Sequence, residues 1–353
     1  MNLQTDLPGW LNRYSGPGFA VKENIITHCN QSAYALLLTT GTDVRELLMT
    51  GKEEYAAFES GCLYLKLKLS AKGWGASVTR DADHFIFLLD QEPEASDLRS
   101  LALAARELRS PLSNLMIAAD SLMRISTEDK QIVEQLARMN RSLHQMHRLV
   151  NNMSDAAKSD ILTPVGVHDW NRLIYDIFEK ISTQLENTRV QLTYEGLSQS
   201  VSGLANAGQI ERAVLNIVSN AMKFLPEGGK IHACLTRRND MLHLSIRDSG
   251  SGIAENVLSN VFTRYQRQPG IEDSRYGIGL GMVLIRAAAA DHGGTVLIDR
   301  PGETGTRVTM TLAIRQDTAT LRSPVLRVDY AGEQDHGLVE LSDCLPLSAY
   351  YEE

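Results

Sequence analysis

The sequence predicts a multidomain α+β protein, because three regions of the chain carry three different hydrophobic patterns. Residues 15–90 alternate short strand-like and helix-like segments, residues 98–158 repeat apolar side chains at heptad spacing, and residues 165–315 mix both patterns. A chain of 353 residues is also too long for one ordinary hydrophobic core, so two or three domains are expected. We expect the divisions at residues 1–95, 96–162, 163–316 and 317–353.

Composition and charge narrow the classes of protein to which the chain can belong. The formal net charge is −8, which argues against a nucleic-acid-binding protein, since such proteins usually present a basic face. No run of about eighteen apolar residues predicts a membrane span, and the N-terminus lacks a secretory pattern. The four cysteines are scattered, without a Cys-x-x-Cys pair, as is typical of reduced thiols. We therefore expect a cytoplasmic protein with no membrane span and no nucleic-acid partner.

The N-terminal region predicts a small α/β domain. Ile25 and Ile26 lie in a strand-like stretch, and residues 33–38 are a short helix candidate. Residues 63–69 alternate with the period of two that is typical of a half-buried strand, and residues 85–89 are a second strand candidate. This order of a strand, short helices and an antiparallel hairpin resembles a PAS sensory domain. The resemblance implies a sensory role, and a small α/β domain of another role is the alternative.

Two heptad helices joined by a short polar turn at residues 126–130 form the second region. Helices of this kind pack as an antiparallel hairpin. A single hairpin leaves its apolar seam half exposed, so a homodimer that makes a four-helix bundle would bury it. A hairpin packed on a neighbouring domain of the same chain is the alternative. The seam residues are Leu101, Ala105, Leu108, Leu112, Leu115, Ala119, Leu122, Ile132, Leu136, Met139, Leu143, Met146, Val150 and Met153.

The first of four motifs in the third region lies on a predicted helix at residues 216–224. Asn216 and Asn220 are four residues apart, so they share one face of the helix. Their side-chain oxygens can ligate Mg²⁺ or its waters, and Lys223 can pair with a phosphate group. This helix face is therefore a candidate site for a metal and a phosphate.

Three further motifs follow along the chain. Asp248 ends a strand-like stretch, where its carboxylate can accept a hydrogen bond from an adenine amino group, and Gly250 and Gly252 let the backbone approach the base. Residues 262–267 form the third motif. The fourth, at residues 277–291, is a glycine-rich turn that opens a helix, and the free amides of such a turn suit a phosphate chain.

Each motif alone is weak evidence for a nucleotide site. Four such motifs in series, followed by Gly305 and Thr306 in a last hairpin, are much stronger evidence. They resemble the N, G1, F, G2 and G3 boxes of the histidine-kinase ATP-binding domain, in the order of that family. The resemblance implies an α/β-sandwich ATPase domain that uses ATP and Mg²⁺. A non-nucleotide α/β domain is the alternative.

The resemblance also assigns roles to individual residues. Asn220 would hold the Mg²⁺, Lys223 would contact phosphate, and Asp248 would recognise adenine. Arg264 would approach the γ-phosphate, and the glycines of the fourth motif would shape a mobile lid. The residues assigned to ATP binding are Asn216, Asn220, Lys223, Phe224, Asp248, Gly250, Gly252, Ile253, Arg264, Gly277, Gly279, Leu280, Gly281 and Thr306.

One position separates two classes within the same superfamily. Gyrase-type ATPases place a glutamate, which activates water, four residues before the Mg²⁺ asparagine. In this chain that position is Asn216, as in histidine kinases. The resemblance therefore favours transfer to a protein group over free ATP hydrolysis.

The first heptad helix departs from the family at one residue. Residues 106–112 have the sequence Arg-Glu-Leu-Arg-Ser-Pro-Leu, whereas the family pattern begins with the histidine that accepts the phosphate. In the family the next residue, here Glu107, accepts the other ring proton of that histidine. The guanidinium of Arg106 stays protonated and has no free lone pair for phosphorus. Autophosphorylation at the usual position is therefore chemically excluded.

Other residues could supply a related activity. Family members that dephosphorylate a response regulator use a residue four positions after the histidine, which is Ser110 here. His144 and His147 on the second helix are candidates for another acceptor, but we expect two solvent-facing histidines beside the seam.

Three hypotheses follow for this cytoplasmic, homodimeric member of two-component signalling. The chain is a pseudokinase in which bound Mg·ATP sets the conformation and the output is binding to a partner, either a response regulator or another signalling protein. Alternatively, it is an active histidine kinase with another acceptor, or a response-regulator phosphatase. Of the three, we favour the pseudokinase.

Overall fold

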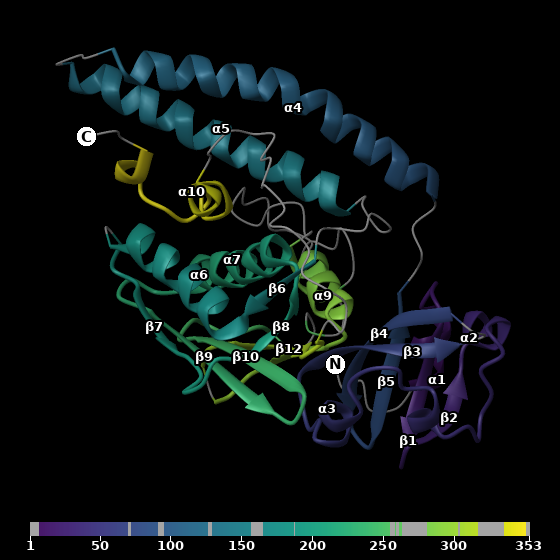
Figure 1. The fold of residues 1–353 in the computed structure, drawn as a ribbon. Helices are drawn as coiled ribbons and strands as arrows, with labels where there is room; N and C mark the ends of the chain where they lie inside the picture. The colour runs from purple at the N-terminus through teal and green to yellow at the C-terminus, as the bar shows by residue number, and fades with distance from the viewer. Residues whose placement is uncertain are drawn as a thin grey trace.

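The computed structural model describes residues 7–69, 72–90, 95–125, 129–156, 165–186, 188–254, 258, 261–262, 281–302, 304–316 and 335–350. Figure 1 shows a helical hairpin above an α/β unit, with a second sheet-rich unit beside that α/β unit. The predicted mixture of helical and α/β regions is confirmed.

The N-terminal unit, residues 7–90, is an antiparallel sheet with short helices. Its five strands are β1 (Gly18–Lys22), β2 (Ile25–Cys29), β3 (Cys62–Leu69), β4 (Lys72–Asp81) and β5 (His84–Leu89), and its helices are α1 (Leu7–Arg13), α2 (Gln31–Ala35), η1 (Val44–Glu46) and α3 (Lys52–Ala56). The strand order is β2-β1-β5-β4-β3. The three strands predicted from sequence are thereby confirmed.

Asn30 fixes the start of this unit. Its side-chain oxygen accepts hydrogen bonds from the backbone amides of Ala33 and Gly18, at 2.9 and 3.1 Å, and its amide nitrogen donates to the carbonyl of Gly16 at 2.7 Å. The first bond caps α2, which satisfies an otherwise unpaired helix amide. One buried side chain therefore holds the loop before β1 against the end of β2.

The hairpin consists of α4 (Ala95–Met123) and α5 (Lys130–Ala156), as predicted. Five seam side chains pack inside the hairpin, where Ala105, Leu112, Ala119, Leu143 and Val150 are buried. Six others are exposed at seven-residue intervals along both helices. These exposed side chains are Leu108, Leu115, Leu122, Ile132, Met139 and Met146.

The expectation that His144 and His147 face solvent is wrong. Their exposed fractions are 8% and 4%, because the C-terminal segment of the chain packs onto this side of α5. That segment contains α10 (His336–Glu340) and η3 (Leu347–Tyr350), and the ring of Tyr350 lies 5.3 Å from the imidazole of His144. Sequence spacing along α5 cannot reveal a neighbour that lies about two hundred residues away.

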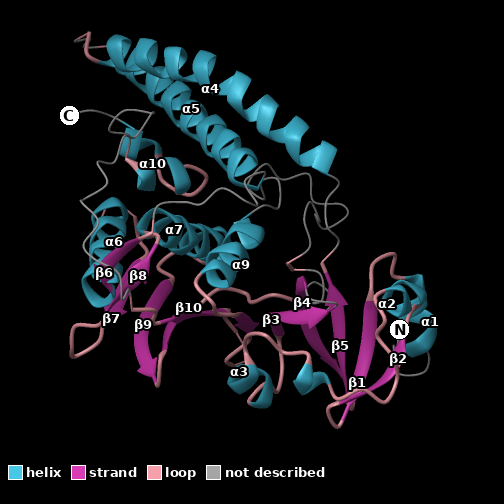
Figure 2. Ribbon diagram, turned by 45° about the vertical axis from the view of Figure 1, so that its right-hand side comes forward, coloured by secondary structure: helices cyan, strands magenta, loops and turns pink. Residues whose placement is uncertain are grey.

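The C-terminal α/β unit, residues 165–316, is a sheet covered on one face by helices (Figures 1 and 2). The buried faces of its helices and strands, among them the fully buried side chain of Trp170, contribute to the largest apolar cluster of the described residues. Its elements are β6 (Gly166–Asp169), α6 (Trp170–Leu185), β7 (Gln191–Glu195), β8 (Ser202–Ala205), α7 (Ala207–Phe224), β9 (Lys230–Arg238), β10 (Met241–Asp248), α9 (Gly281–Asp291), β11 (Val296–Asp299) and β12 (Arg307–Ala313).

The two sheets join edge to edge. β3 pairs antiparallel with β11, which gives one ten-stranded sheet of order β2-β1-β5-β4-β3-β11-β12-β10-β9-β7. Beside this junction the guanidinium of Arg286 on α9 pairs with the carboxylate of Asp90 and lies 5.1 Å from the ring centroid of Tyr64. The Tyr64 hydroxyl donates to Asp90 at 2.7 Å. The N-terminal unit therefore contacts α9 directly, in addition to leading into α4.

None of the helices in the described parts of the chain combines the length and the apolar character needed to cross a membrane. The extended apolar stretch at residues 325–328 lies outside the described residues.

The Asp90–Arg286 pair should contribute measurably to stability. Arg286 is only 9% exposed, so Asp90→Ala leaves a buried guanidinium without its anion. We expect the free energy of unfolding in urea to fall by about 2–3 kcal/mol. The matched control is Asp83→Ala, which removes an exposed ion pair with Lys22 and should cost less than about 0.5 kcal/mol. Equal losses in the two variants would contradict the assigned role of the pair.

Candidate functional site

The face of α7 that carries the two asparagines is buried. Asn206 caps this helix, because its side-chain oxygen accepts from the amide of Gln209 at 3.1 Å. Asn216 is fully buried, and its amide nitrogen donates to the carbonyl of Arg212 at 2.9 Å. The side-chain oxygen of Asn216 is buried with no hydrogen-bond partner among the described residues. A buried acceptor without a partner is costly, so this oxygen is suited to a ligand.

The start of α9 lies directly against these asparagines. A Cβ atom added to Gly281 would lie 3.0 Å from the side-chain oxygen of Asn216 and 3.7 Å from the amide nitrogen of Asn220. The first amides of a helix have no partner within the helix, and they favour anions. Two amide side chains and one helix start therefore meet at a single place.

Asp248 defines a second part of the site, at the end of β10. Its carboxylate is 9% exposed and accepts from the backbone amides of Gly250 and Thr306, at 2.7 and 3.2 Å. Both bonds reach the same oxygen, Oδ1, so they fix the orientation of the carboxylate. Burial raises the pKa of Asp248, although the two amides oppose this effect. The geometry suits an acceptor for a ligand N–H group.

Glycines allow the backbone segments to approach around Asp248. A Cβ atom on Gly250 would lie 2.8 Å from the carbonyl oxygen of Phe224, which brings the end of α7 to this turn. Gly305 has a φ of +86°, and a Cβ atom there would lie 2.3 Å from the carbonyl oxygen of Asp248. Gly252 is also left-handed, with a φ of +78°. Larger residues at these positions would push the second part of the site apart.

The structure thus brings together most of the predicted residues that it describes. Asn216, Asn220 and Gly281 meet on one side, while Phe224, Asp248, Gly250 and Thr306 meet on the other. Ile253 packs against the main core. Four predicted residues, Arg264, Gly277, Gly279 and Leu280, lie outside the described residues.

The donor set fits a Mg²⁺ ion. Amide oxygens are ligands that Mg²⁺ accepts, and the Asn216 oxygen is buried without a hydrogen-bond partner among the described residues. Asn220 lies one helical turn further along the same face and is only partly buried. Among the described residues, no group of three or more histidine, cysteine, aspartate and glutamate side chains forms an alternative metal site.

The position of the missing histidine lies on the outside of the hairpin. Arg106, Glu107 and Ser110 are all exposed on α4. The two histidines of α5 are buried instead, as described above, and the ring nitrogen Nδ1 of His144 pairs with the carbonyl of Asn140 at 2.9 Å. The usual acceptor position on α4 is therefore exposed, whereas the two histidines considered as other acceptors are buried.

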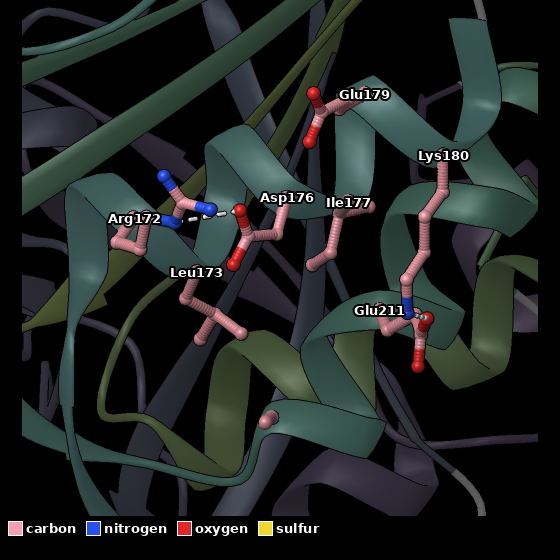
Figure 3. Close-up of a pocket in the computed structure, with 8 residues that line it drawn as sticks. Arg172, Leu173, Asp176, Ile177, Glu179, Lys180 and Glu211 are labelled. Carbon is pink, nitrogen blue, oxygen red and sulfur yellow. Dashed lines mark hydrogen bonds and ion pairs between the residues drawn. The ribbon is translucent and has the colours of Figure 1, made fainter. Parts of the chain in front are cut away.

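A groove of about 390 Å³ lies along α6 and the start of α7 (Figure 3). Within it Lys180 pairs with Glu211 at 3.4 Å, and Arg172 pairs with Asp176 at 2.8 Å. None of the predicted site residues lines this groove, and four of its charged side chains form these two ion pairs. We assign it no role.

The sequence analysis missed four charged residues beside the asparagine face. Arg148 on α5, Arg212 on α7, and Glu340 and Asp343 from the C-terminal segment form a buried cluster with Lys223. No local motif marks them, because the partners are separated by more than one hundred residues in the chain.

Two known family models match this chain, one over the hairpin and one over the C-terminal α/β unit. Residues 98–161 match the family model described as the His Kinase A (phospho-acceptor) domain. Residues 205–316 match the model described as histidine kinase-, DNA gyrase B-, and HSP90-like ATPase. The two models cover the hairpin and most of the C-terminal α/β unit.

Several curated proteins are similar over these regions. The adaptive-response sensory kinase SasA of Crocosphaera subtropica is 30% identical, over 67% of this chain and 66% of SasA. The histidine protein kinase DivJ of Caulobacter vibrioides is 28% identical, over 62% of this chain and 38% of DivJ. The sensor histidine kinase RppB of Synechocystis is 26% identical, over 60% of this chain and 48% of RppB. The chain thus spans less than half of DivJ and RppB.

One solved structure shares the fold over a large part of the chain. The crystal structure of full-length ShkA in complex with AMPPNP matches with a TM-score of 0.51 and 21% identity. The match covers 64% of this chain and 47% of ShkA.

His147 should make stability depend on pH. Burial, together with the nearby His144, Arg109, His336 and Arg212, lowers the pKa of His147 to about 4, from an ordinary value of 6.5. The fold therefore favours the neutral imidazole, and this stabilisation is present above pH 6.5 and is lost as the pH falls towards 4. We expect this residue to account for about 2 kcal/mol of the loss in unfolding free energy between pH 7 and pH 4.5.

Urea unfolding at both pH values checks this. His147→Leu should reduce the loss, whereas the control His28→Leu, at an exposed position of β2, should leave it unchanged. An identical loss in the wild type and in His147→Leu would show that His147 does not cause it.

Proposed function

The chain belongs to the histidine kinase family of two-component signalling, and from this premise we propose that it binds Mg·ATP without phosphorylating itself at residue 106. In this proposal the protein is a pseudokinase, whose output is regulated binding to a response regulator or another signalling protein. The activity of full-length relatives is not assumed, because the chain spans only part of them.

The observation that carries the nucleotide part of the proposal is the buried side-chain oxygen of Asn216 beside Gly281, which has no hydrogen-bond partner within the described part of the chain. We propose that Asn220 holds Mg²⁺ while Asn216 supports the phosphate region, where its oxygen can ligate the ion or its waters. Lys223 would contact phosphate, and Asp248 would accept from the adenine amino group. Bound Mg²⁺ would neutralise phosphate charge. The glycines at positions 250 and 252 would let the base approach, and Arg264, Gly277, Gly279 and Leu280 would complete the site as in the family.

The chemistry of arginine supports the absence of transfer. The guanidinium of Arg106 keeps its proton and offers no lone pair to the γ-phosphorus. Glu107, the neighbour that would orient a histidine, is exposed and has no imidazole to orient. The exposed hydroxyl of Ser110 favours a second candidate function, which is dephosphorylation of a response regulator.

We further propose a homodimer built on the hairpin. Six apolar side chains of the seam stay 39–54% exposed at heptad positions, which is the surface that a second hairpin would cover in a four-helix bundle. We also propose that residues 1–95 form a PAS-like sensory domain, as the single antiparallel sheet with short helices supports.

Nucleotide binding and labelling with γ-labelled ATP test the central proposal together. We expect the wild type to bind Mg·AMP-PNP, and Asp248→Ala to weaken this binding at least about tenfold, because a buried hydrogen-bond acceptor is lost. Asp240→Ala, at the exposed turn between β9 and β10, is the matched control and should bind like the wild type. With labelled ATP, the wild type should acquire no acid-labile phosphate, whereas Arg106→His should acquire it.

Two results would contradict the proposal in different ways. Acid-labile phosphate on the wild type, mapped to His144 or His147, would show an active kinase. Failure to bind nucleotide at millimolar concentration, both by the wild type and by the double variant Glu340→Gln with Asp343→Asn, would contradict the nucleotide site itself. Faster decay of a phosphorylated response regulator in the presence of the protein would establish the second candidate function.

The dimer is tested by changing its exposed stripe. Leu115 is 54% exposed within the heptad stripe, and Leu115→Arg should shift the mass measured by light scattering from dimer to monomer. Ile117→Arg changes a similarly exposed side chain outside the stripe, so that variant should remain dimeric. A monomeric wild type would disprove this assembly.

A further inference from the structure

The C-terminal segment, residues 335–350, lies between α5 of the hairpin and the helices α6 and α7 (Figures 1 and 2). It brings two carboxylates into a cluster of buried cations. Glu340 pairs with Arg148 at 3.1 Å and with Arg212 at 3.5 Å. Asp343 pairs with Arg148 at 2.7 Å and with Lys223 at 3.2 Å. The side chains of Glu340 and Asp343 are 3% and 14% exposed, so both anions are largely removed from water.

The segment covers the same face of α7 that carries the Mg²⁺ and phosphate residues. An oxygen of Glu340 lies 3.4 Å from the amide nitrogen of Asn216, which donates to it. The thiol of Cys344 donates to the carbonyl of Ser219 at 3.5 Å. Lys223, the residue proposed to contact phosphate, is 8% exposed and faces Asp343. Carboxylates therefore lie where the proposed function requires phosphate oxygens.

Further contacts hold the segment in this position. The guanidinium of Arg141 donates to the carbonyls of Ser342 and Asp343, at 3.0 and 3.2 Å. Leu341 and Leu345 are buried in the main apolar core. The segment is therefore docked by apolar and polar contacts rather than by charge alone.

We propose that the C-terminal segment is an intramolecular competitor of Mg·ATP, in which Glu340 and Asp343 take the place of the nucleotide phosphates. This inference rests on the proposed function, because it concerns the same site. Glu340 and Asp343 occupy the space beside Asn216 and Lys223 in which the phosphates would lie, so Mg·ATP binds only when the segment has left. The apparent dissociation constant is then the intrinsic one divided by the fraction of molecules whose segment is undocked.

Docking also links the nucleotide site to the hairpin. Arg148 belongs to α5, whereas Arg212 and Lys223 belong to α7, and the two carboxylates bridge all three cations. Departure of the segment removes this bridge and leaves the direct hydrogen bond from Arg212 on α7 to Asn152 on α5, at 3.2 Å. Nucleotide binding would therefore loosen the attachment of α5 to α7. Such a loosening gives a protein without phosphotransfer a way to report that ATP is bound.

The test compares Mg·AMP-PNP affinity in full-length variants by isothermal titration calorimetry. The double variant Glu340→Gln with Asp343→Asn keeps the shape of both side chains but removes their charge. It should bind at least tenfold more tightly than the wild type. Asp43→Asn, which removes the carboxylate paired with Arg45 in the N-terminal unit, is the matched control and should bind like the wild type.

A second measurement uses the wild type alone and does not depend on the folding of a variant. Burial raises the pKa of the Cys344 thiol, so alkylation of this residue by iodoacetamide should be slow in the free protein. Saturating Mg·AMP-PNP should increase the alkylation rate at Cys344, mapped by mass spectrometry, at least several-fold. Cys62, which is fully buried in β3, should stay unreactive throughout.

The outcomes separate this inference from the proposed function. Tighter binding by the double variant and faster alkylation of Cys344 support competition. If the wild type binds the nucleotide but its Cys344 alkylation rate stays unchanged, the proposed function stands and the competition is overturned. If neither the wild type nor the double variant binds the nucleotide, the proposed function and the competition are both overturned.

Discussion

The arrangement depends on a buried ion cluster in which Glu340 and Asp343 join Arg148, Arg212 and Lys223. Removing a single member of such a cluster leaves an uncompensated charge in a desolvated site, so the cluster stays intact unless another anion replaces the carboxylates. The negatively charged phosphate oxygens of Mg·ATP could pair with the same three cations. The cluster therefore holds the hairpin, the ATPase-like unit and the C-terminal segment together, at the place where ATP is proposed to bind.

Helix α9 connects the candidate site to the N-terminal unit. α9 begins at Gly281 beside the two asparagines, and five residues later its Arg286 pairs with Asp90 beside the ring of Tyr64. Tyr64 lies on β3, the strand that joins the two sheets. A change in the N-terminal unit can thus reach α9 through a direct contact, in addition to the covalent path into α4. In the proposed pseudokinase such couplings would carry the output, because Arg106 cannot accept phosphate at the usual position.

Sequence patterns predicted those elements whose signal lies in a short, continuous stretch of the chain. Heptad spacing predicted α4 and α5, and the Asn216 and Asp248 motifs predicted a helix and a strand end that the structure contains. The half-exposed seam also follows from one hairpin being unable to cover it. The burial of His144 and His147, the β3–β11 pairing and the docked C-terminal segment were not predictable in this way. Each depends on contacts between distant segments, for which the local sequence carries no periodic signal.

In the proposed competition, the docked C-terminal segment and bound Mg·ATP exclude each other. Hydrogen exchange tests it most directly, because the amide of Leu341 donates to the carbonyl of Gly337 at 2.9 Å, and the amide of Leu345 donates to Leu341 at 3.0 Å, only while the segment is folded in place. Saturating Mg·AMP-PNP should accelerate exchange at these two amides while it protects amides near Asp248. Protection near Asp248 with unchanged exchange at Leu341 and Leu345 would contradict it.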